Sequence, residues 1–318
     1  MDSRFKIIFL LAIIAMTAMP LAGILRGTSS PPIDPDIVSS TPVPGGPPIR
    51  MATATNQDRS ESVTDMVLIP AGEFIQGTNN GGFNEKPERT VWLDEYWIDP
   101  YEVTTVEYLK FVEETGHRKP GPPSRYAKRL AQLRGDHQPI TYVSWHDADA
   151  YCRWKGKRLP TEAQWEKAMR GIDGRLLPWG NSPRPFRANL GGSEDGFEST
   201  AVVGSFPQDR SPYGVYDGLG NLMEWVEDWY REQPNGPANS LQTNFADRGG
   251  YKTLRGAGYT SFGNDLRLTA RSFMVPDFRD ETIGFRCARS NLEREDHSDL
   301  VAESVNEDSA RENRSNRE

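Results

Sequence analysis

Residues 214–229, GVYDGLGNLMEWVEDW, combine turn-forming glycines with two pairs of an acidic residue and tryptophan. The stretch has too many glycines for a helix interior and is too irregular for a plain strand. In an extended run, Gly220, Leu222 and Glu224 would face one side. Together with Asp217 they would offer two carboxylates and two backbone carbonyls, an oxygen set that suits calcium. On spacing alone, a glycine turn with solvated acids is the simpler interpretation, because this is not an EF-hand loop.

With one more residue at each end, YGVYDGLGNLMEWVEDWY resembles the signature of the formylglycine-generating enzyme family, the sulfatase-modifying factors. The resemblance covers about residues 65–289 through a series of ordered blocks. These blocks are MVLIPAGEFIQGT, VTTVEYLKFVEETG, PITYVSWHDADAYCRWKGKRLPTEAQWEKAMRG, LPWGN, TLRGAGY, LTARS and IGFRCAR. The resemblance implies an α+β fold, the irregular C-type-lectin-like variant of this family, with little regular secondary structure, calcium ions and a disulfide.

Composition separates the middle of the chain from its two ends. The chain has 318 residues, a formal net charge of −8 and a mean hydropathy of −0.65. The acidic balance, without a basic cluster, argues against a nucleic-acid partner. Residues 26–62 are rich in Pro, Ser and Thr and predict a disordered linker, while 291–318 predict an acidic disordered tail. The family-like domain is then expected at 63–290.

The amino terminus predicts export. Arg4 and Lys6 precede an uncharged apolar run at 7–25, which is typical of a signal peptide and is also long enough to span a bilayer. The best cleavage site, at Leu21-Ala22-Gly23, is poor, so we favour an uncleaved membrane anchor over a cleaved signal. The expected location of the domain is periplasmic or on the extracellular face.

Local patterns predict four strands and three helices in the first half of the domain. Two strands are expected within 66–78 and two more within 90–98. Each helix begins with a capping box and ends at a glycine. The predicted helices are 105–115, 145–155 and 162–170. Residues 177–289 show little periodicity and predict much irregular chain.

The resemblance implies two calcium sites. In the family, each site combines oxygens of two side chains with two backbone carbonyls. The matching residues here are Asp217, Gly220, Leu222 and Glu224 for one site, and Asn189, Leu190, Asp195 and Phe197 for the other. Asp217 stands where the family usually has asparagine, which keeps an oxygen and adds a charge. We therefore expect structural Ca²⁺ at both sets.

The chain contains only two cysteines, Cys152 and Cys287. Behind an export signal, an even pair is more often bonded than free. Both positions match the structural disulfide of some family members, so the resemblance predicts a bond between them. The loop that it closes spans 135 residues, and loop entropy then gives a stabilisation of roughly 5 kcal/mol at most.

The catalytic members of the family bind copper(I) with two further cysteines, which this chain lacks. The matching segment, residues 255–264, contains no cysteine, is about three residues shorter, and has Gly258 in place of a serine. Copper(I) prefers thiolates, and the hydroxyls of Thr260 and Ser261 would bind it poorly. We therefore expect no copper centre. The four histidines are not at metal-ligand spacing, so an iron site of the kind found in related sulfoxide synthases is not predicted either.

Three functions remain open. The first is an exported domain without oxidase activity that binds a peptide, glycan or envelope protein as an accessory module. The second is an enzyme of the family with altered chemistry, such as protein or small-molecule maturation in the cell envelope. The third is a structural subunit of an envelope complex. The candidate cleft residues are Tyr259, Thr260, Ser261, Asn264, Arg267 and Arg271. For the second function, the charged residues near the cleft that could serve are Asp265, Arg267, Arg271 and Asp277, although we favour scaffold ion pairs as their role.

Overall fold

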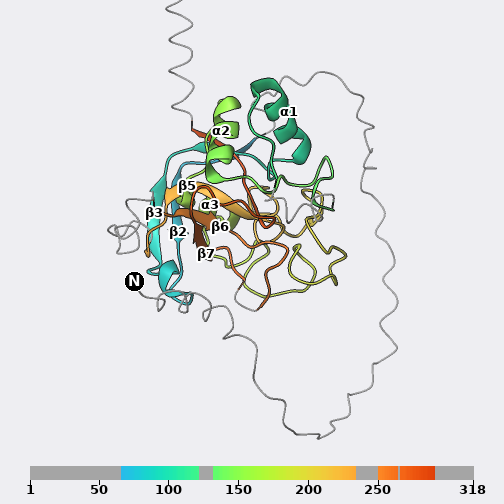
Figure 1. Ribbon diagram of the computed structural model, residues 1–318. Helices are drawn as coiled ribbons and strands as arrows, with labels where there is room; N and C mark the ends of the chain where they lie inside the picture. Colours follow the sequence, from blue (N-terminus) through green and yellow to red (C-terminus); the bar gives the residue numbers. More distant parts are fainter. Residues whose placement is uncertain (1–65, 122–131, 234–249, 264–265, 291–318) are drawn as a thin grey trace, which may run out of the picture. The chain divides into compact units, whose positions relative to one another are not determined.

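The computed structural model describes residues 66–121, 132–233, 250–263 and 266–290 (Figure 1). The predicted anchor, linker and acidic tail, and also Asn264, lie outside the described residues. Within the described ranges, no helix has the length and apolar character needed to cross a membrane.

The three predicted helices are confirmed, and each begins with the predicted capping box. They are α1, Thr105–Thr115, α2, Trp145–Trp154, and α3, Glu162–Arg170. At the start of α2, the Ser144 hydroxyl accepts a hydrogen bond from the backbone N–H of Asp147, which satisfies a donor that a helix start otherwise leaves unpaired. The helix bounds thus follow from cap residues that act locally.

The four predicted amino-terminal strands are also confirmed, and they enter two separate sheets. β1, Val67–Ile69, pairs antiparallel with β4, Tyr96–Ile98, and β4 pairs with the last strand, β9, Ala288–Ser290. β2, Gly72–Gln76, and β3, Arg89–Leu93, form a hairpin-like ribbon. The two ends of the described domain therefore meet in one sheet.

A four-stranded sheet occupies the region where the sequence predicted irregular chain. Its order is β7-β6-β5-β8, with β8 parallel to β5 and the other pairs antiparallel. The strands are β5, Met223–Trp229, β6, Lys252–Arg255, β7, Arg271–Met274, and β8, Ile283–Gly284. A short 3-10 helix, η2, covers Phe83–Glu85 in the loop between β2 and β3.

This sheet corrects the expectation that residues 214–229 are too irregular for a strand. The irregular part ends before β5: Asp217 and Asn221 have positive φ angles of 57° and 68°, which non-glycine residues rarely adopt. From Met223 onward the backbone is a strand. The strand was missed because buried charges in β5 and β6 interrupt the apolar pattern that normally marks a buried strand.

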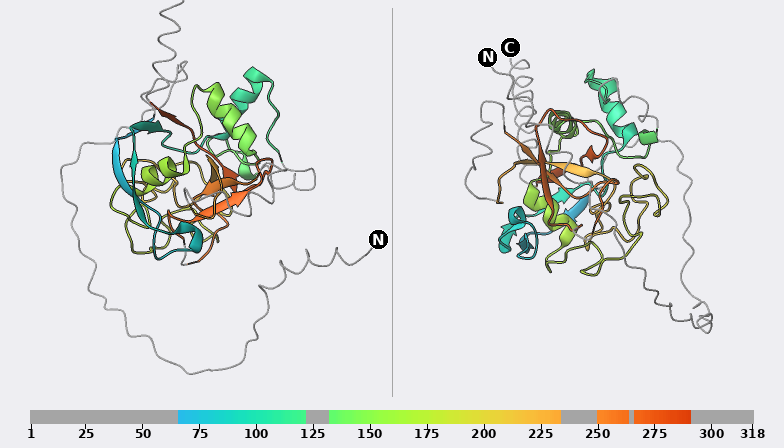
Figure 2. Two further views of the ribbon diagram at one scale, coloured as in Figure 1. Left: turned by 90° about the vertical axis from the view of Figure 1, so that its left-hand side faces the viewer. Right: turned by 60° about the horizontal axis from the view of Figure 1, so that its bottom comes forward.

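The first half of strand β5 is buried on both faces and separates two hydrophobic clusters. Trp225 packs with residues of α1 and α2 on one face, and the next residue, Val226, packs with residues of α3 on the other. Figure 2 shows α1 and α2 side by side, in agreement with their shared cluster. Cys152 of α2 and Cys287 lie in the first cluster and form the predicted disulfide, with Cα atoms 5.6 Å apart.

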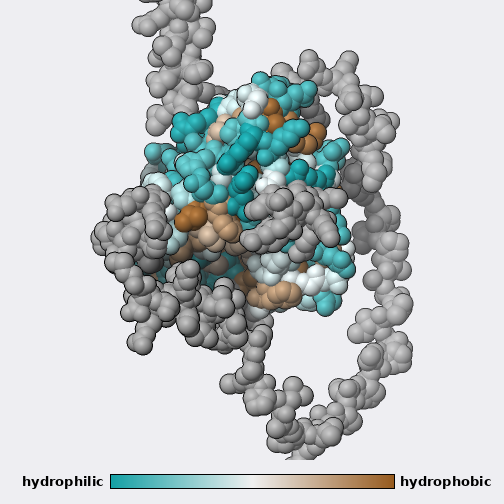
Figure 3. Space-filling model, viewed as in Figure 1, coloured by the Kyte–Doolittle hydropathy of each residue, from teal (hydrophilic) through white to brown (hydrophobic). Residues whose placement is uncertain are grey.

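The surface seen in Figure 3 is mostly hydrophilic, with small separate apolar areas. The exposed large apolar side chains come from many different elements and include Trp92, Ile172 and Phe262. Scattered residues of this kind are normal for a protein surface.

Candidate functional site

The turn after β6 lies in the segment that the family resemblance matches to the two copper-binding cysteines of the catalytic members. Gly256 has a φ of 77° and turns the chain into the interior. Tyr259 is buried, packed in a small cluster with Leu133, Tyr142 and Leu222. Its backbone N–H donates to the carbonyl of Asn221 (2.8 Å). An aromatic side chain therefore fills this part of the interior.

The rest of this turn is tied to a neighbouring loop. The Ser261 hydroxyl accepts from the Gly258 N–H (3.1 Å), and the Ser261 carbonyl accepts from the Gly191 N–H (2.7 Å). Phe262 is 74% exposed and its ring lies against Gly191. Thr260 is exposed. This segment therefore offers only the exposed hydroxyl of Thr260 and the hydrogen-bonded hydroxyl of Ser261. Without a thiol, these groups do not fit copper(I).

Arg267 and Arg271, the charged members of the candidate cleft, are engaged in ion pairs. Arg267 donates to both carboxylate oxygens of Glu85 (2.7 and 2.6 Å), and Arg271 donates to Glu162 (3.0 Å for Nη2–Oε2). The structure therefore does not gather the described cleft residues into one pocket. It supports the scaffold interpretation that the sequence left open for these two arginines.

Arg271 belongs to a buried group of charges that we call the arginine cluster: Glu162, Glu166, Arg170, Arg255 and Arg271. Arg255 of β6 contacts Glu166 (2.7 Å) and Glu162 (3.4 Å), both on α3. Arg170 contacts Glu166 (3.0 Å) one turn away. Each carboxylate faces at least one guanidinium, so the charges compensate one another and join α3 to β6 and β7.

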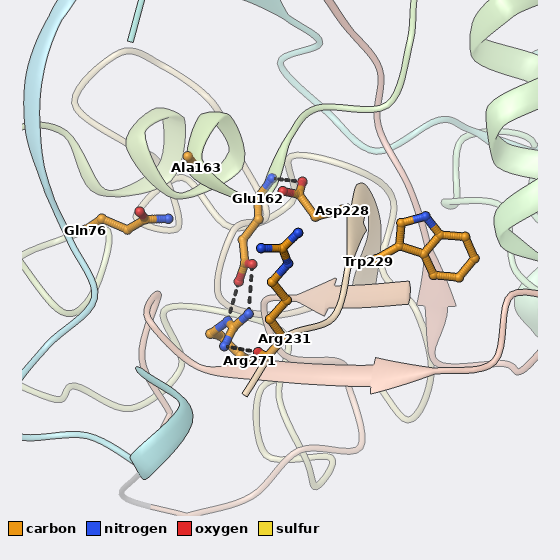
Figure 4. A pocket seen from close by; sticks show the side chains of 7 residues that line it. All are labelled: Gln76, Glu162, Ala163, Asp228, Trp229, Arg231 and Arg271. Atoms are coloured by element: carbon orange, nitrogen blue, oxygen red, sulfur yellow. Dashed lines mark hydrogen bonds and ion pairs between the residues drawn. The ribbon is translucent and has the colours of Figure 1, made fainter. Parts of the chain in front are cut away.

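A polar pocket of about 220 Å³ opens beside the arginine cluster (Figure 4). Its lining combines residues of β2, α3, β5 and β7 with one residue that follows β5. The lining residues are Gln76, Glu162, Ala163, Asp228, Trp229, Arg231 and Arg271. Burial, together with the nearby Glu162 carboxylate, raises the pKa of Asp228 to about 6. Only Arg271 was a candidate from sequence, because the lining comes from separate segments of the chain and no single motif contains all of it.

The predicted calcium set of Asn189, Leu190, Asp195 and Phe197, called the first set below, contains a buried oxygen without a hydrogen-bond donor among the described residues. Asn189 is buried, and its side-chain nitrogen donates to Ser199 and to Asn221 (3.0 Å each). Its side-chain oxygen is buried and meets no donor within the described part of the chain. Asp195 accepts from the N–H groups of Leu190 and Phe197 (3.0 Å each), which closes the loop. The unsatisfied amide oxygen of Asn189, in the same loop as the Asp195 carboxylate, is suited to bind a calcium ion.

Asp217 and Glu224, the two carboxylates of the second predicted set, belong to a buried group that we call the acid cluster: Glu102, Asp209, Asp217, Glu224 and Arg286. All five are almost fully buried. Arg286 donates to both oxygens of Glu224 (2.8 and 2.7 Å). Burial and the charge of Asp217 raise the pKa of Asp209 to about 8, and burial raises that of Asp217 to about 6. The acid cluster thus contains four carboxyl groups and only one guanidinium.

Glu224 has little capacity left for a cation in this arrangement. Besides Arg286, the indole N–H of Trp165 donates to it (3.0 Å). Three of about four lone-pair positions are therefore occupied. Asp217 accepts one bond, from the Gly204 N–H (2.6 Å). Glu224 stays a predicted calcium ligand, while Asp217 is the better-placed oxygen of the set.

One side chain joins Asn189 of the first set to the acid cluster by hydrogen bonds. Asn221 accepts from Asn189 (3.0 Å) and donates to Glu102 (2.7 Å). In the described ranges, no three His, Cys, Asp or Glu side chains converge as a metal site. The predicted sets contain at most two carboxylates each and depend on an amide and backbone carbonyls.

Known proteins share both the sequence and the fold. The model of the sulfatase-modifying factor enzyme 1-like domain matches residues 51–291. The formylglycine-generating enzyme of Mus musculus is 33% identical, with 75% of this chain and 78% of that protein covered. The inactive C-alpha-formylglycine-generating enzyme 2 of Mus musculus is 31% identical over 71% of this chain and 85% of that protein. The solved structure of PvdO from Pseudomonas aeruginosa matches with a TM-score of 0.58 and 27% identity, covering 71% of this chain and 94% of that one.

These matches define the fold class first. It is the irregular, C-type-lectin-like α+β fold that the sequence predicted, with short helices and small sheets. The chain belongs to the sulfatase-modifying factor family. Its relatives include proteins named as formylglycine-generating enzymes and proteins named as inactive.

Proposed function

We propose that this domain is a binding or accessory module that does not carry out copper-dependent formylglycine formation. The observation that carries the proposal is that the only two cysteines of the chain are bonded to each other in the interior. A copper(I) centre of the family type needs a thiolate pair. The buried side chain of Tyr259 in the turn after β6 gives further support.

The direct test is an oxidation assay with the full chain. The protein is incubated with copper, dioxygen and a Cys-x-Pro-x-Arg peptide, and mass spectrometry detects the aldehyde product. A catalytic relative serves as the positive control and a protein-free mixture as the negative control. We expect no product above the protein-free level, and turnover above it would overturn the proposal.

An enzyme with altered chemistry is the second candidate. The charged residues that would serve it, Arg267 and Arg271, are held by Glu85 and Glu162, and this favours a scaffold role. The third candidate is a structural subunit of an envelope complex. Peptide and glycan arrays separate the first candidate from the third: a binding module retains a defined peptide or glycan, whereas a structural subunit retains neither and co-purifies with envelope proteins after crosslinking.

We also propose that the domain is exported and binds structural calcium. Asn189 and Asp195 with their side chains, and Leu190 and Phe197 with their carbonyls, would hold the ion in the first set. The unsatisfied oxygen of Asn189 supports this set. Calcium would supply positive charge that ties the loop together, and no catalytic step is assigned to it.

A further inference from the structure

The pocket beside the arginine cluster is polar, and its charges are compensated within the protein. Glu162 is paired with Arg271, and the positive charge of Lys252 acts on Asp228. All three guanidinium nitrogens of Arg271 donate hydrogen bonds, to Glu162 and to backbone carbonyls. Arg231 is also engaged in an interaction within the protein. A charged ligand would therefore gain no surplus counter-charge here, and its desolvation would cost free energy.

Two residues of the lining keep a hydrogen-bonding position for a ligand. The side-chain oxygen of Gln76 accepts from Nη2 and Nε of Arg89 (2.8 and 3.3 Å), which turns its amide nitrogen toward the pocket (Figure 4). Gln76 is only 2% exposed, and within the described part of the chain this nitrogen has no acceptor. One oxygen of Asp228 accepts from the backbone N–H of Glu162 (2.6 Å), and among the described residues its other oxygen accepts no hydrogen bond. The pocket thus presents a donor from β2 and an acceptor from β5.

We propose that this pocket binds one ring of a neutral sugar, whose hydroxyl groups accept from the Gln76 amide and donate to the Asp228 carboxylate. A hydroxyl can do both, because it carries one donor and two acceptor lone pairs. The volume of about 220 Å³ lies below the roughly 300–1,000 Å³ of drug-sized sites, which limits the ligand to about one ring. The inference rests on the binding-module function proposed above and names its class of ligand.

The lining favours several hydroxyl groups over other ligand chemistry. Glu162 accepts three hydrogen bonds from guanidinium groups and keeps about one of its four acceptor positions. Together with Asp228 it asks for donors on more than one ligand atom, and bonds from hydroxyls to carboxylates are charge-assisted. A sugar carries hydroxyls on several ring carbons, whereas a primary amide of a peptide has its donors on one nitrogen. An apolar group would leave Gln76 and Asp228 without partners.

The first experiment titrates the full chain with glucose, galactose and mannose, followed by calorimetry and ligand-observed NMR. Concentrations extend to about 50 mM, which covers weak sites. The 2-amino and uronic acid derivatives of each sugar add one positive or one negative charge to the same ring, and acetamide represents a peptide amide. We expect at least one neutral sugar to bind, and its charged derivatives and acetamide to bind at least about tenfold more weakly. The proposal is overturned if no neutral sugar binds, or if a charged derivative or acetamide binds as tightly.

Variants then locate the site. Gln76→Glu keeps the oxygen that faces Arg89 and replaces the amide donor by an acceptor. Asp228→Asn keeps an acceptor for the Glu162 N–H and removes the carboxylate. Each should weaken binding of the sugar by about tenfold or more. Glu227→Gln, an exposed residue on β5 outside the lining, is the matched control and should change affinity less than about twofold. Circular dichroism verifies that each variant is folded, and unchanged affinity in a folded Gln76→Glu or Asp228→Asn variant would reject the proposal.

The sugar titration and the tests of the proposed function fail separately. Aldehyde formation in the oxidation assay would overturn the accessory-module function, whatever the sugars do. A chain that forms no aldehyde and retains a peptide on the array, but binds no neutral sugar, would keep the binding-module function and overturn only the sugar site.

Discussion

The arginine cluster and the acid cluster are both buried and both contact α3, but their charges balance differently. In the arginine cluster two glutamates face three arginines, and Asp228 nearby makes the numbers equal. The acid cluster has four carboxyl groups and one arginine, Arg286, which forms an ion pair with Glu224. The balanced group acts as a fastener, whereas the unbalanced one needs protons or a cation to exist in the interior.

One side chain connects the two clusters. The indole N–H of Trp165 donates to Glu224 of the acid cluster, and the guanidinium of Arg255 lies 5.3 Å from the indole ring centre. Trp165 itself is fully buried. A change in one cluster can therefore reach the other through this ring, and experiments should perturb the clusters separately.

The largest effect is expected from breaking the balanced cluster. Arg255→Met leaves Glu166 facing one arginine fewer and removes the donor to the carbonyls of Leu268, Thr269 and Ala270. Loss of one partner of a buried pair costs about 3–5 kcal/mol. Guanidinium denaturation followed by tryptophan fluorescence measures the change.

The control for this variant is a surface pair on α2. Arg153→Met removes a contact with Asp149 (2.9 Å), and the Arg153 side chain is 73% exposed. Such pairs contribute about 0.5 kcal/mol or less. If both variants lose the same amount, the arginine cluster is not a fastener.

A smaller effect is expected at the glycine beside Trp165. A Cβ at Gly256, where φ is 77°, would lie 3.1 Å from the Gly218 carbonyl oxygen and 3.2 Å from the Trp165 ring. We therefore expect Gly256→Ala to destabilise the fold by about 2 kcal/mol. At Gly258 the nearest atom would be 3.4 Å away, so Gly258→Ala should stay within about 0.5 kcal/mol of wild type. Thermal melts compare the two, and equal losses would contradict the geometry.

Adding or removing calcium tests the two predicted calcium sets. At free calcium tenfold above the dissociation constant, ligand linkage gives a stabilisation of about 1.4 kcal/mol for one site. Chelator should lower the melting temperature by a corresponding amount. Asp195→Asn should abolish part of this difference, while Glu198→Gln, an exposed acid in the same loop, should retain it. If neither calcium nor chelator changes the melting temperature, the calcium proposal is rejected.

The smallest effect is expected from Asp228. Its folded pKa, about 6, lies above its ordinary value of 3.8. Its contribution to stability is therefore fully present below pH 3.8 and is lost as the pH rises through 6. In Asp228→Asn, the free energy of unfolding should no longer fall over this pH range. At pH 7 it should be about 1 kcal/mol higher than in wild type, which is less than the full pKa shift would give because the side chain is partly exposed. Denaturation midpoints at pH 4, 5.5 and 7 measure it, and parallel curves for the two proteins would contradict the assignment.

The parts of the fold that could be predicted from sequence depend on interactions between residues close together in the chain. Ser144 and Thr161 fix helix starts through bonds to residues three positions along the chain. The disulfide came from family resemblance and is confirmed. The four-stranded sheet was missed because Lys252 and Arg255 in β6 are charged yet buried. Only long-range partners make these residues compatible with a strand interior.

The same reason limited the prediction of the candidate site. Asp228 lies within the family signature at 213–230, but the groups that define its environment, Gln76 and Glu162, come from β2 and α3. Glu102, Asp209 and Arg286 join the acid cluster from three distant segments. No local pattern marks such residues. Conversely, Arg267 was a candidate by position alone, and its contact with Glu85 became visible only in three dimensions.

The bond between Cys152 and Cys287 also determines how this molecule meets its surroundings. With both sulfur atoms joined and fully buried, the chain offers nothing for peroxide to oxidise to a sulfenic acid and no handle for glutathione or nitric oxide. Oxidants that act on sulfur are therefore left with the methionine side chains of this protein.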